Sequence, residues 1–256
     1  SEMCIRDRYK IENGNLMLHA CVPLADDGSL LEVTLFGKTY RGRALYDMVD
    51  ASVRAAFSAT DEAERKRGLD MLWYLWLGPG SPLFAKSKMA TFELYLIADK
   101  AARKEVKNPF YSLLDDEAVV DGIFRDFGMD PATSRIICGH VPVKVKDGED
   151  PVKCGGRVLT IDGGFSKAYQ PTTGIAGYTL ISNSYGFVLA AHEPLESMRA
   201  AVVNELDIHS SRKVVELVDK RTLVADTDNG SVLKQQIADL EELLEAYRCG
   251  ILAEKE

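Results

Sequence analysis

Residues 134–143 read SRIICGHVPV, an apolar run that stops at Gly-His140 and is followed by proline. A short β-branched run bounded by glycine and proline is typical of a buried strand. Residues 15–22 (NLMLHACV) and 158–164 (VLTIDGG) show the same pattern, with an apolar strand that gives way to a polar residue. Ligand sites in α/β proteins collect at such strand ends. The three stretches therefore predict a sheet with His19 and His140 near its functional edge.

The rest of the chain alternates between helical and β-rich segments. Apolar spacings of three and four residues predict helices at residues 43–60, 61–77, 91–106, 113–127 and 193–206, and a last helix from about residue 231. Short β-rich runs predict strands at residues 29–36, 178–182 and 186–191, and a hairpin at residues 213–225. The last helix places an apolar stripe on one face, and we expect it to pack on its own sheet rather than to dock a partner. This order predicts a mixed α/β sheet protein that carries a helical insertion.

The first eight residues, SEMCIRDR, differ in character from the rest of the chain. They contain no apolar core of a signal peptide. We interpret residues 1–8 as a non-native leader that packs against nothing, and we expect the natural chain to begin upstream of Tyr9. The remaining organisation is then a pair of strands at 9–40, a helical insertion at 41–128, and a C-terminal part at 129–256 that ends in the last helix.

Composition excludes several classes of protein. The 256 residues are 46% hydrophobic and 27% charged, which excludes a disordered or collagen-like chain. The 31 basic and 39 acidic residues give a net charge of −8, which argues against a nucleic-acid partner. No window is apolar enough for a membrane span, so we expect no membrane association. Five cysteines without a C-x-x-C pair favour a reducing cytoplasm.

The residue types alone leave two interpretations open for each candidate site. His19 and His140 are either satisfied core residues or ligands, and spacing by itself favours the core interpretation. Five cations and four acidic residues share positions 141–170, which is typical either of an anion-facing edge or of a solvated loop. We expect His192 and His209 to have structural roles.

Three longer stretches resemble a known family. They are WYLWLGPGSPLFAKSKMATFELYLIADK at 73–100, CGHVPVKVKDGEDPVK at 138–153 and VLTIDGGFSKAYQPTTGIAGYTLISNS at 158–184. Together with LMLHACVPL at 16–24, they resemble the bacterial class III fructose-1,6-bisphosphatases, within the calcineurin-like metallophosphoesterases. The resemblance implies a sandwich of mixed β-sheets flanked by helices, of which this chain would be a C-terminal fragment.

The resemblance also implies a site of two metal ions, with manganese as the metal. His19 looks like the lone histidine of the superfamily and His140 like its final Gly-His, so both would ligate one metal. The motifs D-x-H, G-D-x-x-D-R-G and G-N-H-[DE] are absent from the sequence. We expect them upstream of Tyr9. The lysines Lys86, Lys144 and Lys167, together with Tyr169, are the residues that we expect near substrate phosphates.

The implied activity is removal of the 1-phosphate of fructose 1,6-bisphosphate during gluconeogenesis, by attack of a water held between two metals. The partner would then be a small sugar bisphosphate, and a homo-oligomer is compatible with the sequence. Two alternatives stay open. The first is another calcineurin-like phosphoesterase, which hydrolyses dinucleoside polyphosphates or phosphoproteins. The second is an inactive fragment or binding module, because residues 1–256 alone contain ligands for only one metal.

Overall fold

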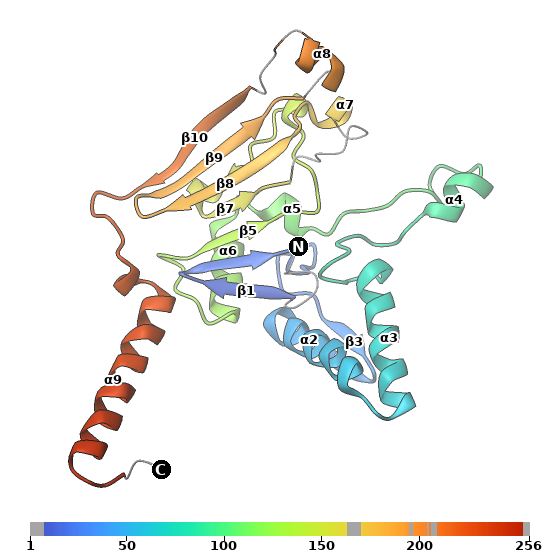
Figure 1. The fold of residues 1–256 in the computed structure, drawn as a ribbon. Coiled ribbons are helices and arrows are strands. Elements are labelled where there is room, and N and C mark those ends of the chain that lie inside the picture. The colour runs from blue at the N-terminus through green and yellow to red at the C-terminus, as the bar shows by residue number, and fades with distance from the viewer. Residues whose placement is uncertain (1–7, 163–169, 195–196, 204, 206–208, 253–256) are drawn as a thin grey trace.

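The computed structural model describes residues 8–162, 170–194, 197–203, 205 and 209–252. A five-stranded sheet with the order β1-β2-β5-β7-β6 forms the centre of this part (Figure 1). Its strands are β1 (Tyr9–Glu12), β2 (Asn15–Leu18), β5 (Arg135–Cys138), β6 (Val152–Lys153) and β7 (Val158–Thr160). The three central strands β2, β5 and β7 are parallel, and β1 and β6 run antiparallel at the two edges. The three apolar stretches that end in polar residues are therefore neighbours in one sheet, as predicted.

The main hydrophobic core lies between this sheet and α6 (Glu117–Asp126). Leu16 and Ile136 from the parallel strands are fully buried there, and so is Phe124 from the helix. Strands that are buried on both faces lose the alternation of polar and apolar residues, which is why these runs are almost continuously apolar. Asp116 caps α6 by accepting hydrogen bonds from the backbone N–H groups of Ala118 and Val119.

Two long helices, α2 (Gly42–Ser58) and α3 (Glu62–Leu77), form a hairpin beside the sheet. They bury Leu45, Val49 and Met71 in a second core, next to the small hairpin of β3 (Val33–Leu35) and β4 (Lys38–Tyr40). The predicted helices at 43–60 and 61–77 are confirmed to within two residues. Helix α3 ends at Gly78, whose N–H donates to the carbonyl of Tyr74.

The predicted helix at 91–106 is wrong beyond its first turns. Helix α4 (Thr91–Leu96) ends at Ile97, which has an extended conformation. The chain then returns toward the body, and Ser87 N–H donates to the carbonyl of Val106. This backbone pairing replaces the helical bonds that residues 98–106 would make. The short helix α5 (Phe110–Leu113) follows and leads into α6.

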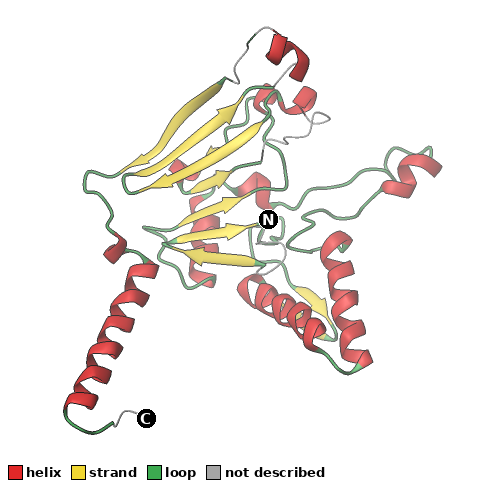
Figure 2. Cartoon of the chain, in the orientation of Figure 1, coloured by secondary structure: helices red, strands yellow, loops and turns green. Residues whose placement is uncertain are grey.

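A second, antiparallel sheet has the order β10-β9-β8 and lies beside the first one (Figure 2). Its strands are β8 (Gly177–Asn183), β9 (Gly186–His192) and β10 (Ser210–Leu217), and short helical turns around it are η1 (Val145–Asp147), η2 (Cys154–Gly156), α7 (Gln170–Thr173) and α8 (Met198–Val203). Arg135 joins the two sheets. It forms an ion pair with Glu216, and its guanidinium carbon lies 5.2 Å from the centre of the Phe187 ring. The predicted hairpin at 213–225 is wrong, because β10 pairs with β9 instead.

The last helix, α9 (Asp228–Arg248), projects away from both sheets (Figure 1). The short turn η3 (Val224–Asp226) precedes it. Its predicted apolar stripe exists, but the side chains of Leu240 and Leu244 are exposed. The expectation that this helix packs on its own sheet is therefore wrong.

The fold class agrees with the prediction of a mixed α/β protein with mixed strand directions. Among the described residues, no helix is both long and apolar enough to cross a lipid bilayer.

Candidate functional site

Two parallel strands bring the first two candidate residues together. His19 follows β2 directly, and His140 lies two residues after β5. Because β2 and β5 are parallel neighbours, their carboxyl ends lie at the same edge of the sheet. The backbone N–H of Gly139 donates to the carbonyl of His19 at 3.1 Å and fixes this register. The nitrogen atoms Nε2 of His19 and Nδ1 of His140 then lie 3.1 Å apart.

The imidazole of His140 is held in a defined orientation. Its Nε2 lies 3.1 Å from the carbonyl oxygen of Phe84, which can only accept a hydrogen bond. The proton of a neutral ring therefore belongs on Nε2, and Nδ1 carries the lone pair that faces His19. The backbone of His140 has a φ of 66°. A non-glycine residue in the left-handed region is strained, and such strain is concentrated at functional sites.

The surroundings of both histidines favour the neutral form. The pKa of His19 is lowered by burial and by the neighbouring His140. Burial also lowers the pKa of His140, and Lys86 adds to this effect. The Asp162 carboxylate opposes the shift at both rings. A neutral imidazole is the form that ligates a metal.

Asp162 is a third member of the site that was not singled out as a ligand from the sequence. It follows β7, the next parallel strand, so it reaches the same edge as the two histidines. A Cβ atom added at Gly139 would lie 3.6 Å from the Asp162 Cβ and 3.9 Å from its Oδ2. The strand-end rule that selected the histidines applies equally to Asp162 and could have identified it.

The two imidazoles fit one side of a metal centre. Two nitrogens bound to one metal at about 2.1 Å lie roughly 3.0–3.4 Å apart, depending on the coordination angle, and the observed separation of 3.1 Å falls in this range. Within the described residues, no group of three or more histidine, cysteine, aspartate or glutamate side chains could hold a metal ion. His19 and His140 are therefore a pair of donors rather than a complete coordination sphere.

A cavity of about 250 Å³ opens beside the two histidines. Arg8, Leu72, Leu75, Trp76, Leu83, His19 and His140 line it. Arg8 is 4% exposed, so the expectation that the leader packs against nothing is wrong at this residue. Residues 1–7 lie outside the described part of the chain. Trp76 lies on α3, so the helical hairpin forms one wall of this cavity.

The structure places two of the four predicted phosphate-contacting residues. Lys86 lies two residues after Phe84, and its Nζ is 2.6 Å from an Oε2 atom of Glu105. Lys144 follows His140 by four residues and pairs with Asp147 at 3.5 Å. Lys167 and Tyr169 lie outside the described residues.

Lys107 is a further cation near the site that was not predicted from the sequence. It pairs with Lys86 through an isolated antiparallel backbone bridge. Burial lowers its pKa, and repulsion from the ammonium groups of Lys144 and Lys86 lowers it further. Glu105 and Glu149 supply the opposing charges. The sequence offered no signal for this grouping, because 20 residues, which include helix α4, lie between the two bridged lysines.

The structural role predicted for His192 is confirmed. Its two ring nitrogens lie 2.8 Å from Thr179 Oγ1 and 2.8 Å from Ser210 Oγ, on the two strands that flank β9. This histidine therefore joins three strands of the second sheet. His209 is exposed and next to the same sheet.

Comparison with known proteins gives one consistent result. The family model described as "Firmicute fructose-1,6-bisphosphatase" matches residues 7–249. A class 3 fructose-1,6-bisphosphatase of Clostridium botulinum (strain Kyoto / Type A2) is 52% identical over 248 residues, which are 96% of this chain and 37% of the relative. The corresponding protein of Clostridium novyi (strain NT) is 51% identical over 249 residues, or 97% of this chain and 37% of the relative.

No solved structure matches the chain. The chain spans 37% of the length of the curated relatives that it matches. The match nevertheless includes both candidate histidines, their strands and helix α9. The chain belongs to the Firmicute fructose-1,6-bisphosphatase family.

Proposed function

We propose that this chain is the part of a fructose-1,6-bisphosphatase that supplies His19 and His140 to a metal centre. The observation that carries the proposal is the approach of the two imidazoles to 3.1 Å at the ends of parallel strands. Relatives that share about half of its residues are named fructose-1,6-bisphosphatases. The reaction is hydrolysis of the 1-phosphate ester, which leaves fructose 6-phosphate and phosphate.

The metal that we propose is manganese, in a centre of two ions. Bound there, the metals would lower the pKa of a water molecule and neutralise charge on the phosphoryl oxygens. This chain would contribute two imidazole donors, and polypeptide outside these 256 residues would supply the other ligands. Phe84 sets the tautomer of His140 through its carbonyl, and Asp162 provides a negative charge beside both rings. Partners of this kind commonly orient metal-binding histidines.

The cations near His140 are proposed to bind substrate phosphate. Lys86, Lys107 and Lys144 converge there although the whole chain carries a net charge of −8. Lys86 is already paired with Glu105, so an incoming phosphate would have to compete with this carboxylate. Lys167 and Tyr169 remain proposed phosphate contacts from the sequence. The parent enzyme is proposed to be a calcineurin-like sandwich and to act in the cytoplasm, where Cys21, Cys138 and Cys154 would stay as free buried thiols.

The first test reads the gene upstream of the Tyr9 codon. A frame that continues through D-x-H, G-D-x-x-D-R-G and G-N-H-[DE] would supply the missing ligands and support a two-metal enzyme. A start codon close to Tyr9, without these motifs, would contradict the proposal and favour an inactive binding module.

The second test measures phosphate release by the longer enzyme with manganese present. His140→Ala should reduce kcat/KM for fructose 1,6-bisphosphate by about a hundredfold or more, because loss of a group that only supports a metal ligand already costs about 10–100-fold. His192→Ala is the matched control, since it removes an imidazole that joins strands of the other sheet. Equal activity of the His140→Ala variant and the parent would remove His140 from the site.

The choice of substrate separates the proposed activity from its alternatives. The longer enzyme should hydrolyse fructose 1,6-bisphosphate in preference to a dinucleoside polyphosphate or a phosphoprotein. The 256-residue chain alone should hydrolyse little of any of them, because its described residues offer only two metal donors. Manganese-dependent phosphate release by this chain, abolished in His140→Ala, would contradict that expectation.

A further inference from the structure

The segment that connects α3 to α4 (Figure 1) contains a tight turn at residues 81–85. The turn includes SPLF, part of the stretch 73–100 that resembles the family. Ala85 N–H donates to the carbonyl of Ser81 at 3.0 Å and closes the turn, and Ala85 has a φ of 57°. Non-glycine residues seldom adopt this left-handed conformation, and those that do are concentrated at functional sites. The turn is therefore a candidate for a role in the site.

The hydroxyl group of Ser81 holds this turn from the inside. Its side chain is fully buried, and its Oγ donates to the carbonyl of Leu75 at 2.7 Å. That carbonyl lies in the last turn of α3, and the residue four positions on is Pro79, which has no N–H to pair with it. The same Oγ accepts from the N–H groups of Leu83 at 3.2 Å and Phe84 at 3.3 Å. One hydroxyl group thus joins the end of α3 to the turn.

Two backbone hydrogen bonds tie the turn to the body. Cys21 N–H donates to the carbonyl of Pro82 at 3.2 Å. Cys21 follows His19 by two residues, so this bond fixes the turn against the strand end that carries the histidine. Asn108 N–H donates to the carbonyl of Ala85 at 2.9 Å and holds the other end of the turn. The turn therefore has a fixed position relative to the candidate site.

The geometry of one peptide group directs the Phe84 carbonyl at His140. In a trans peptide, the C=O of one residue and the N–H of the next point in opposite directions. Ala85 N–H points back into the turn, toward the Ser81 carbonyl. The Phe84 C=O consequently points out of the turn, and its oxygen lies 3.1 Å from Nε2 of His140. The turn thus decides which ring nitrogen keeps the proton, and it leaves the lone pair of Nδ1 for a metal ion.

We propose that Ser81 is a positioning residue for the metal centre. Its hydroxyl group holds the turn, and the turn holds the Phe84 carbonyl that keeps the His140 ring in the Nε2–H form. Without this hydroxyl group, one carbonyl and two N–H groups lose a buried partner, so the turn relaxes. The inference rests on the proposed role of His140 as a ligand. It adds that the helical hairpin supports this role, because α3 supplies the carbonyl that anchors Ser81.

The first test observes the His140 ring in the 256-residue chain by long-range proton–nitrogen correlation NMR. The parent should show a single tautomer with the proton on Nε2, whereas Ser81→Ala should show both tautomers in exchange. Ser81→Cys keeps the size of the side chain but is a weaker hydrogen-bonding partner. It should give the same change with less loss of packing, and it replaces Ser81→Ala should that variant fail to fold. A single Nε2–H tautomer in these variants would overturn the proposal.

The second test measures the dissociation constant of manganese in the longer enzyme. Ser81→Ala should raise it about tenfold or more, since loss of a group that supports a metal ligand costs about 10–100-fold in affinity. Thr173→Ala is the matched control, because its hydroxyl group is also buried but donates to the Ile175 carbonyl beside the second sheet. With manganese at saturation, kcat of Ser81→Ala should return close to that of the parent, which a general loss of structure would not allow.

The outcomes separate this inference from the proposed function. An unchanged manganese dissociation constant in Ser81→Ala, with a raised one in His140→Ala, would overturn the role of Ser81 and keep His140 as a ligand. Unchanged values in both variants would contradict the proposed function and the inference together. Equal losses of manganese affinity in Ser81→Ala and Thr173→Ala would also overturn the proposal, because they would trace the effect to stability and not to the orientation of the ring.

Discussion

The body and the helical hairpin of this chain differ in how far they bury a phenylalanine side chain. In the body, Phe124 of α6 is fully buried between the helix and the parallel strands. On the helical hairpin, Phe57 near the end of α2 is 81% exposed. Burial of a phenylalanine side chain contributes a few kcal/mol, whereas an exposed one contributes almost nothing. The sheet and α6 therefore bury their large apolar side chains more completely than the helical hairpin, which buries one core of its own and leaves other apolar side chains exposed.

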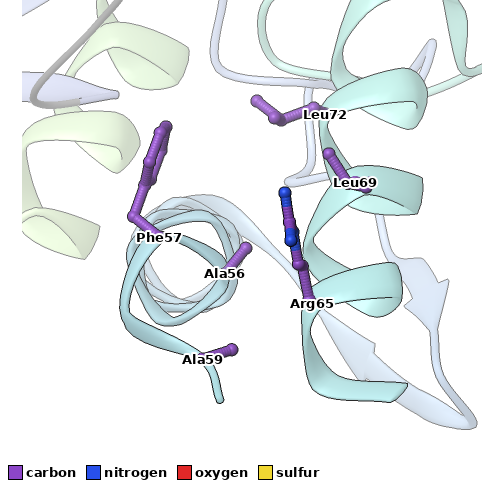
Figure 3. A pocket seen from close by; sticks show the side chains of 6 residues that line it. All are labelled: Ala56, Phe57, Ala59, Arg65, Leu69 and Leu72. Carbon is purple, nitrogen blue, oxygen red and sulfur yellow. The ribbon is translucent and has the colours of Figure 1, made fainter. Parts of the chain in front are cut away.

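Other apolar side chains of the projecting helices are exposed in the same way as Phe57. Large exposed apolar side chains lie on α3 and α4, namely Leu69, Trp73, Trp76, Phe92, Leu94, Tyr95 and Leu96. Between α2 and α3, a hollow of about 360 Å³ is lined by Ala56, Phe57, Ala59, Arg65, Leu69 and Leu72 (Figure 3). The apolar residues there face open space instead of a packed partner. Hydrophobic content alone thus does not distinguish a stabilising element from a surface.

The largest test of this contrast is one substitution made in both regions. Phe124→Ala should lower the free energy of unfolding by about 3–5 kcal/mol, because it leaves a cavity in the main core. Phe57→Ala should change it by less than about 0.5 kcal/mol, as expected for an exposed position. Urea unfolding of the 256-residue chain, followed by circular dichroism, measures both. Similar losses for the two variants would show that the hairpin is packed more tightly than the structure indicates.

A smaller effect is expected where the two helices of the hairpin touch. A Cβ atom at Gly68 of α3 would lie 1.9 Å from the Cβ of Ala56 on α2. Gly68→Ala should therefore force the helices apart and cost about 1–3 kcal/mol. In Gly122→Ala the same methyl group meets nothing within 4 Å, and this variant should gain about 0.5–1 kcal/mol from higher helix propensity. The melting temperatures of both variants measure these effects. A Gly68→Ala variant as stable as the parent would contradict the close contact between Gly68 and Ala56.

Much of the body was predictable from local sequence. The runs RIIC and VLT are short, mostly apolar and followed within a few residues by glycine, and they are β5 and β7 in the parallel part of the sheet. Helices α2 and α3 were predictable from their apolar spacing, and α3 ends at Leu77, as predicted. In each of these cases the local pattern and the packing agree, so that nothing from distant parts of the chain overrides the signal.

The failures occur where distant residues decide the conformation. Residues 98–106 have the composition of a helix, but their backbone pairs with residues around Ser87 instead. Residues 213–217 belong to a strand whose partner is β9, and not to a local hairpin. The apolar stripe of α9 was visible in the sequence, whereas its exposure depends on where the helix points. Periodicity identifies an apolar face and leaves the surface that covers it undetermined.

The candidate site shows the same division. The strand-end rule selected His19 and His140, and their parallel strands bring them to 3.1 Å. The rule could also have selected Asp162, which follows the next strand. Lys107 could not be predicted from the sequence, because only the return of the chain after α4 places it opposite Lys86. Residues that share a sheet edge are therefore accessible to sequence reasoning, whereas residues that a loop brings back are not.

The smallest expected effect lies at the junction of the two regions. The N-cap residue of α2, Arg41, provides no side-chain cap, and the Asp126 carboxylate at the end of α6 accepts the N–H of Arg43 at 2.6 Å instead. Asp126→Ala should cost about 1 kcal/mol, as the loss of a helix cap usually does. Asp126→Asn should cost less, since its amide oxygen can still accept the bond. Hydrogen exchange should show the loss first in the opening turn of α2, because the body keeps its own core. Equal protection of that turn in Asp126→Ala and in the parent would mean that the Asp126 hydrogen bond is not needed, and that other contacts, such as the hydrogen bond from Tyr46 to the carbonyl of Cys21, hold the hairpin on the body.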